Sequence, residues 1–136
     1  MTLLSLERGE TVKITQSNED YLEAILLLEN NGSTRSIDVA NLLKVSKAAV
    51  SIAMKDLMDK ELVEKAPYGD IFLTAKGKQI ATETLTKHNL LRKFLMQIGV
   101  DANTAEDECC KIEHILSANT IKCIKSLSEK LSQSEI

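Results

Sequence analysis

The sequence predicts a mainly α-helical protein with a single β-hairpin, and three observations support this class. Six segments combine helix-capping residues with apolar residues at helical spacing. Only one pair of short strand-like runs flanks a turn sequence. No linker rich in proline, glycine or serine interrupts the helical segments.

The composition fits one compact domain, or two very small ones, and excludes several classes. The 136 residues are 43% hydrophobic and 27% charged, which is enough to bury a core. No apolar stretch approaches the roughly 18 to 20 residues that a bilayer span needs, and the N-terminus lacks the features of a secretory signal. We therefore expect a cytoplasmic protein with no membrane partner. Three cysteines, an odd number, also argue against a disulfide framework.

The first helix is predicted after residues 1–16, which show no clear period and are expected to be a loose lead-in segment without regular structure. Ser17 is expected to cap this helix, with Asp20 three residues later completing a capping box. The helix should stop at the Asn-Asn-Gly sequence of residues 30–32. Because it is apolar nearly all round, it should lie in the interior of its domain.

Two more helices and the hairpin follow. A short helix is predicted over about 36–43, and Ser46 is expected to cap a third helix that ends near Lys60. Residues 62–65 and 71–74 then read as two strands around a Pro-Tyr-Gly-Asp turn. A two-stranded hairpin is too small to be stable alone, so it should pack against the helices.

The remainder of the chain predicts three helices. Thr74 opens a long helix that Gly99 ends. A fifth helix follows Asn103 and Thr104 and reaches about Leu116, and a sixth covers about 119–131.

The order helix, tight turn, helix, hairpin is that of a winged helix-turn-helix. Apolar residues at suitable spacing would pack the two helices of the motif together: Val39, Leu43, Val45, Val50 and Ala53. The outward face of the second of these helices would then carry the DNA-reading residues: Ser46, Lys47, Ala48, Ser51, Ile52 and Lys55.

The charge pattern supports DNA binding only locally. The net charge of −3 fails the simplest test for a nucleic-acid binder, but residues 44–55 hold three lysines and no acid. Lysines and helix N-termini bind phosphates, and Ala48 and Ile52 suit contacts with thymine methyls. A lysine-rich helical face alone more often serves solubility. Together with the turn and the hairpin, it favours double-stranded DNA as partner, whereas four aromatics are too few for a single-strand stacking surface.

Residues that bind transition metals recur on the predicted first and fifth helices. Cys110, Glu113 and His114 stand at i, i+3 and i+4, so they should share one face of the fifth helix. A thiolate, a carboxylate and an imidazole together suit Fe(II), Co(II), Ni(II) or Zn(II). Asp20 and Glu23 share a face of the first helix in the same way.

His88 lies on the long helix in a stripe that should be its buried side, with Ile80, Thr84, Leu91 and Leu95. Each candidate has an ordinary explanation: Asp20 as a capping residue, His88 as a hydrogen-bonded core residue, Cys110 as a small hydrophobe, Glu113 as a solvated charge. Taken as a set on helices that must pack together, they favour a metal site.

Several stretches occur in a specific order and spacing: residues 19–23, the helix-turn-helix, 73–77, 88–91, 99–100 and 110–117. With them the sequence resembles the diphtheria toxin repressor family of metal-dependent transcriptional regulators, and within it the short manganese transport regulator type. The resemblance covers nearly all of residues 17–131.

The resemblance implies a homodimer whose contact uses the fifth and sixth helices and part of the fourth. We expect residues 1–76 to form the winged helix-turn-helix domain, including the lead-in of 1–16, and residues 77–136 to form a helical metal-binding and dimerisation domain. Longer relatives carry a further C-terminal barrel domain, which we do not expect here.

The resemblance also implies a metal site, often binuclear, between the first helix and the later ones. One ion would be held by Asp20, Cys110, Glu113 and His114. The second would be held by Glu23, His88, a bridging Glu113 and a backbone carbonyl near Cys110. Up to two ions per subunit are therefore expected.

One departure bears on the identity of the ion. The manganese-type members have a glutamate where Cys110 stands, whereas iron-type members have a cysteine there and a methionine where Asp20 stands. A thiolate favours Fe(II) or later metals, so we expect Fe(II) slightly ahead of Mn(II). Cys109 should point about 100° away from Cys110 on the helix, so the two thiols are not expected to bind one ion.

The sequence thus predicts a homodimeric repressor of metal-uptake genes that binds a palindromic operator when activated by Fe(II) or Mn(II). Two alternatives belong to other classes. One is a winged-helix regulator that responds to oxidation of Cys109, Cys110 or Cys123. The other is a catalytic metal centre, which is disfavoured because no separate general base is apparent, so no enzymatic activity is expected.

Overall fold

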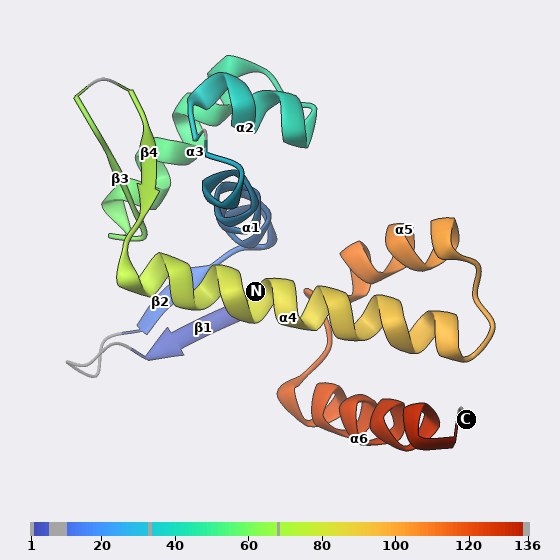
Figure 1. The fold of residues 1–136 in the computed structure, drawn as a ribbon. Coiled ribbons are helices and arrows are strands. Elements are labelled where there is room, and N and C mark those ends of the chain that lie inside the picture. Colours follow the sequence, from blue (N-terminus) through green and yellow to red (C-terminus); the bar gives the residue numbers. More distant parts are fainter. Residues whose placement is uncertain (1, 6–10, 33, 68, 135–136) are drawn as a thin grey trace. The chain divides into compact units, whose positions relative to one another are not determined.

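The computed structural model describes residues 2–5, 11–32, 34–67 and 69–134. It confirms a mainly α-helical class (Figure 1). The elements of the described residues are, in chain order, β1 (Thr2–Ser5), β2 (Thr11–Ile14), α1 (Gln16–Asn30), α2 (Ser36–Leu43), α3 (Lys47–Asp59), β3 (Val63–Lys65), β4 (Ile71–Leu73), α4 (Ala75–Gln97), α5 (Ala102–Ile112) and α6 (Ala118–Ser134). The chain forms two compact units, Met1–Glu83 and Thr84–Ile136, and the division falls within α4. We call them the N-terminal unit and the C-terminal unit. No helix among the described residues is both long and apolar enough to cross a bilayer.

The lead-in segment contains a β-hairpin, so the prediction of a segment without regular structure is wrong for its described residues. β1 pairs antiparallel with β2, with Thr2 opposite Ile14 and Ser5 opposite Thr11. Ile14 is fully buried. Four-residue strands are too short for an alternating pattern to stand out in the sequence, although their β-branched threonine, valine and isoleucine residues favour strands.

α1 begins earlier than predicted, because its cap is Thr15 rather than Ser17. The Thr15 Oγ1 accepts a hydrogen bond from the Asn18 N–H at 3.1 Å, and the Asn18 Oδ1 accepts one from the Thr15 N–H at 3.2 Å. This is a capping box, but Asp20 is not part of it. The predicted interior position of α1 is confirmed by its buried apolar residues Tyr21, Leu22, Ala24, Ile25 and Leu26.

The helix-turn-helix forms as predicted, with one exception. The Ser46 Oγ caps α3 by accepting from the Ala49 N–H at 3.0 Å. Val39 and Val50 are buried, and Leu43 and Ala53 are half-buried. Val45 was expected in this core but is 38% exposed, because it lies in the turn after the end of α2 rather than on either helix.

The wing is the antiparallel pair β3–β4, in which Val63 lies opposite Leu73. Tyr68 of the predicted turn lies outside the described residues. β3 lies beside α3 and β4 beside α1 (Figure 1). The Leu73 N–H donates to the Glu29 carboxylate of α1 at 3.0 Å, and the Ile71 N–H donates to the Thr34 carbonyl at 3.0 Å. The hairpin therefore depends on α1 and the segment after it, as expected for a sheet of two short strands.

The C-terminal unit contains the second part of α4 together with α5 and α6. The Asp101 carboxylate caps α5 by accepting from the Thr104 N–H at 3.0 Å, so α5 begins at Ala102 rather than after Asn103 and Thr104 as predicted. The Gln97 side chain joins α4 to α6, since it donates to the Ser132 Oγ at 2.9 Å and accepts from the Ser128 Oγ at 2.6 Å.

Candidate metal centre and DNA-reading surface

A buried histidine of α4 is the centre of a cluster of metal-binding side chains in the C-terminal unit. The His88 Nδ1 lies 2.9 Å from the Glu113 Oε2, and its Nε2 lies 3.0 Å from the Glu106 Oε1. His88 is only 8% exposed, and the predicted buried stripe of α4 is confirmed at Ile80, Thr84 and Leu91, whereas Leu95 is half-buried. Carboxylates on both ring nitrogens fix the orientation of the imidazole.

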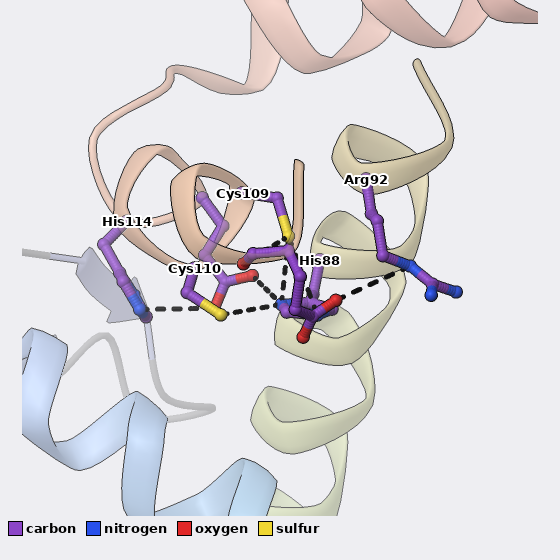
Figure 2. Close-up of polar contacts among 7 residues, drawn as sticks. His88, Arg92, Cys109, Cys110 and His114 are labelled. Atoms are coloured by element: carbon purple, nitrogen blue, oxygen red, sulfur yellow. Dashed lines mark hydrogen bonds and ion pairs between the residues drawn. The ribbon is translucent and has the colours of Figure 1, made fainter. Parts of the chain in front are cut away.

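Both cysteines of α5 face the same imidazole (Figure 2). The Cys109 Sγ lies 3.7 Å from each ring nitrogen of His88, and the Cys110 Sγ lies 3.7 Å from the Nδ1. One ligand atom from each of the three residues falls within 4.8 Å of the others. The expectation that Cys109 faces away from the site of Cys110 is therefore wrong. Neighbouring side chains diverge by about 100° on a helix, but here His88 from α4 is within reach of both.

Glu113 is a buried carboxylate shared by two imidazoles. It is 1% exposed, and its Oε1 lies 3.3 Å from the His114 Nε2 while its Oε2 contacts His88. The Arg92 Nε lies 3.7 Å from the Glu106 Oε2, at the edge of the cluster. A buried carboxylate is stable only when it is paired and hydrogen-bonded. This arrangement therefore provides a site for positive charge.

The pKa of the buried Cys109 thiol is raised to about 11, first by burial and then by the negative charges of Glu106 and Glu113. The negative charges of these carboxylates disfavour a thiolate but favour a bound cation, because a cation compensates them. The mixed donor set of imidazole, carboxylate and sulfur fits a divalent transition metal.

The fifth helix is shorter than predicted, and this changes where two ligand candidates stand. α5 ends at Ile112, with Glu113 as its C-cap residue. The Glu113 N–H still donates to the Cys109 carbonyl at 3.1 Å, so Glu113 keeps its helical position relative to the cysteines. His114 lies in the following turn rather than on the helix.

Two of the predicted ligands belong to the N-terminal unit. Asp20 and Glu23 are half-buried and stand three residues apart on α1, so they share one face of that helix. Their part in a metal site remains a prediction.

Sequence reasoning missed the contacts of Glu106 and Cys109 with His88. Glu106 stands four residues before Cys110 and seven before Glu113, which is the spacing of one helical face. That spacing was the available signal. No spacing along the sequence predicted the contact of Cys109 with His88, because this contact forms only when α4 packs against α5.

The predicted DNA-reading residues lie on an exposed face at the start of α3. Ser46 and five residues of the helix are exposed: Lys47, Ala48, Ser51, Ile52 and Lys55. Ile52 is 73% exposed, so its side chain is accessible to a partner on this face. Their contact with DNA remains a prediction.

A winged helix-turn-helix followed by a helical unit with clustered metal-binding side chains defines the class of metal-responsive DNA-binding regulators. Comparison with known protein families supports this class. Residues 13–71 match the N-terminal DNA-binding domain of the iron dependent repressors, and residues 74–135 match their metal-binding and dimerisation domain. The chain belongs to this family of transcriptional repressors, as the resemblance predicted.

Curated relatives cover most of the chain. An uncharacterised HTH-type transcriptional regulator of Methanocaldococcus jannaschii is 39% identical over 86% of this chain and 96% of its own length. The HTH-type transcriptional regulator MntR of Bacillus pumilus is 37% identical over 89% of this chain and 85% of its own. The protein is thus a transcriptional regulator and not an enzyme, and the alternative of a thiol redox regulator is not favoured.

Solved structures of similar proteins show the same fold. The manganese regulator SloR is 30% identical with a TM-score of 0.74, over 82% of this chain and 53% of SloR. IdeR of T. acidophilum is 27% identical with a TM-score of 0.69, over 83% of this chain and 53% of its own. This chain therefore spans about half the length of these two regulators.

Proposed function

We propose that this protein is a cytoplasmic homodimeric repressor of metal-uptake genes, which binds a palindromic operator when it is loaded with Fe(II) or Mn(II). The observation that carries the proposal is the buried Glu113 carboxylate, which contacts His88 at 2.9 Å and His114 at 3.3 Å in a unit that belongs to the family's metal-binding domain. The relatives named MntR support a role in metal-dependent transcription.

The proposed ligands combine the cluster of the C-terminal unit with two carboxylates of α1. The full set is Asp20, Glu23, His88, Cys110, Glu113 and His114. For the last four, the contacts described above support the assignment. For Asp20 and Glu23 the support is the motif of residues 19–23 and their common face on α1. With Glu113 as a shared ligand, the set suffices for two ions per subunit.

The donor atoms favour Fe(II) over Mn(II). Mn(II) prefers oxygen and nitrogen ligands, whereas a thiolate selects later or softer metals. Cys110 lies against the same imidazole as the carboxylates, at 3.7 Å from the His88 Nδ1. The structure of the regulator ScaR with bound Zn²⁺, from a protein 27% identical, is an example of a later metal in this fold.

Dimerisation is supported by the exposed apolar residues of the C-terminal unit. Large apolar side chains stand exposed on or beside its helices: Met96, Ile98, Ile115 and Leu127. The helices proposed for the subunit contact are α5, α6 and part of α4. A two-fold dimer would present two α3 helices to successive major grooves about 34 Å apart, which is why a palindromic operator is proposed.

The switch follows from the charge of the proposed ligands. A bound divalent ion supplies positive charge that neutralises Asp20, Glu23 and Glu113. Without it, these carboxylates repel one another and disfavour the arrangement that the operator requires. Metal then needs only to favour the DNA-competent form in a pre-existing equilibrium.

The test is replacement of Glu113 by glutamine, which keeps the size of the side chain and removes its charge. We expect Glu113→Gln to lose the metal-dependent increase in operator affinity. Glu108→Gln, on the exposed side of the same helix, is the matched control and should retain it. If Glu113→Gln responds to Fe(II) and Mn(II) like the wild type, the proposed function is wrong in its mechanism.

A further inference from the structure

Cys109 is a buried thiol that the proposed ligand set leaves without a role. Its side chain is fully buried, and its Sγ lies 3.7 Å from both ring nitrogens of His88. It donates a hydrogen bond to the Glu106 carbonyl at 3.3 Å. An inert core thiol would be surrounded by apolar groups, whereas this one borders an imidazole and a second thiol.

We propose that Cys109, Cys110 and His88 form a second binding mode of the centre, one that takes a thiophilic divalent ion of the Zn(II) class. The geometry supports this directly, because one ligand atom from each of the three residues already falls within 4.8 Å of the others. Two thiolates and one imidazole leave a fourth position, as in tetrahedral zinc sites. The inference rests on the proposed function, since it uses two of its ligands.

The two binding modes exclude each other. The thiophilic ion takes Cys110 from the proposed ligands of one regulatory ion and His88 from those of the other, so one subunit holds either the regulatory ions or the thiophilic ion. The thiophilic ion would be held entirely by residues of the C-terminal unit. On binding, the S–H bonds of both cysteines break, the protons pass to solvent and both electron pairs go to the metal. Cys109 therefore sets the discrimination between thiophilic and oxygen-preferring ions at this centre.

The first test counts sulfur ligands in the wild-type protein. Metal-free full-length protein is loaded with one equivalent of Zn(II) per subunit and measured by X-ray absorption at the zinc edge. We expect two sulfur ligands at about 2.3 Å and at least one nitrogen ligand. One sulfur ligand or none would overturn the proposal.

The second test uses variants. Cys109→Ala should lower the preference for Zn(II) over Mn(II) by at least about 10-fold, and the sulfur-to-metal charge-transfer absorption of the Co(II) form by about half. Cys123→Ala, which removes an exposed thiol, is the matched control and should change neither. Circular dichroism establishes that each variant is folded. An unchanged preference and absorption in folded Cys109→Ala would refute the role of Cys109.

The two proposals fail separately. If wild-type protein shows two sulfur ligands to Zn(II) but its operator affinity does not change with Fe(II) or Mn(II), the proposed function fails and the thiophilic site stands. If operator affinity rises with Fe(II) or Mn(II) but zinc has a single sulfur ligand, only the thiophilic site fails.

Discussion

Replacing Gly77 by alanine tests how closely α4 begins against the base of the wing. Gly77 lies in the first turn of α4, where its N–H donates to the Thr74 Oγ1 at 3.1 Å. A Cβ atom on this residue would lie 2.0 Å from the Leu62 carbonyl oxygen and 3.0 Å from its carbonyl carbon. The backbone of one of these segments would therefore have to move by about 1.4 Å to restore ordinary contact.

The expected effect is a loss of stability despite the better helix propensity of alanine. Overpacking of this kind costs about 1–3 kcal/mol. Moving the Leu62 carbonyl also endangers the hydrogen bond that it accepts from the Thr74 N–H at 3.1 Å, which is worth about 0.5–1.5 kcal/mol. The helix propensity of alanine is more favourable than that of glycine by about 1 kcal/mol, which offsets part of this cost. The net result is a destabilisation between about 0.5 and 3.5 kcal/mol.

Urea denaturation followed by circular dichroism measures this difference. Lys78→Ala, the next residue on α4 and exposed, is the matched control and should unfold within about 0.5 kcal/mol of the wild type. If Gly77→Ala is as stable as the wild type or more stable, then α4 does not begin in close contact with Leu62 and the reasoning is refuted.

Two further predictions concern the N-terminal unit. A hydrogen bond from the Asn18 Nδ2 at 2.9 Å, helped by Lys60, holds the pKa of Asp56 below its usual range. A carboxylate whose pKa is lowered in the folded state stabilises the protein at pH values above its unfolded pKa of about 4. This stabilisation is lost as the pH falls through the folded pKa. Asn18→Ala should therefore destabilise the protein by about 1–2 kcal/mol at pH 7, and by less near pH 3, as measured by urea denaturation. A destabilisation that becomes larger at low pH would contradict this. Lys47→Ala should weaken operator binding across sequences and reduce the slope of log affinity against log salt by about 1, measured by fluorescence anisotropy; an unchanged slope would remove Lys47 from the phosphate contacts.

The elements of the N-terminal unit could be predicted well because local signals and tertiary packing agree there. Ser46 caps α3, and the strands of the wing lie within a residue of their predicted bounds. The start of α1 was wrong because two equivalent capping signals compete, at Thr15 and Ser17. The hairpin of β1 and β2 was missed because its strands are too short to show a pattern. Val45 was misplaced for a related reason: its spacing was read as helical although it follows the end of α2.

The candidate site was predictable only in part. The spacing of Cys110 and Glu113 follows from helix geometry, so the sequence contained it. The contacts of Cys109 depend instead on where α4 places the His88 imidazole between two cysteines. No pattern along one helix encodes that distance. The burial of Glu113 to 1% exposure likewise results from packing rather than from its own sequence neighbours.

The most direct test of the central claim is metal-dependent operator binding by wild-type protein. Fluorescence anisotropy on DNA from the protein's own upstream region would be measured with metal-stripped protein, and then during anaerobic titration with Fe(II) and Mn(II). The account predicts that at least one of these ions raises operator affinity in a saturable way. Tight binding that is indifferent to metal would leave the winged helix as a DNA reader and contradict the role of the Glu113 cluster as the sensor.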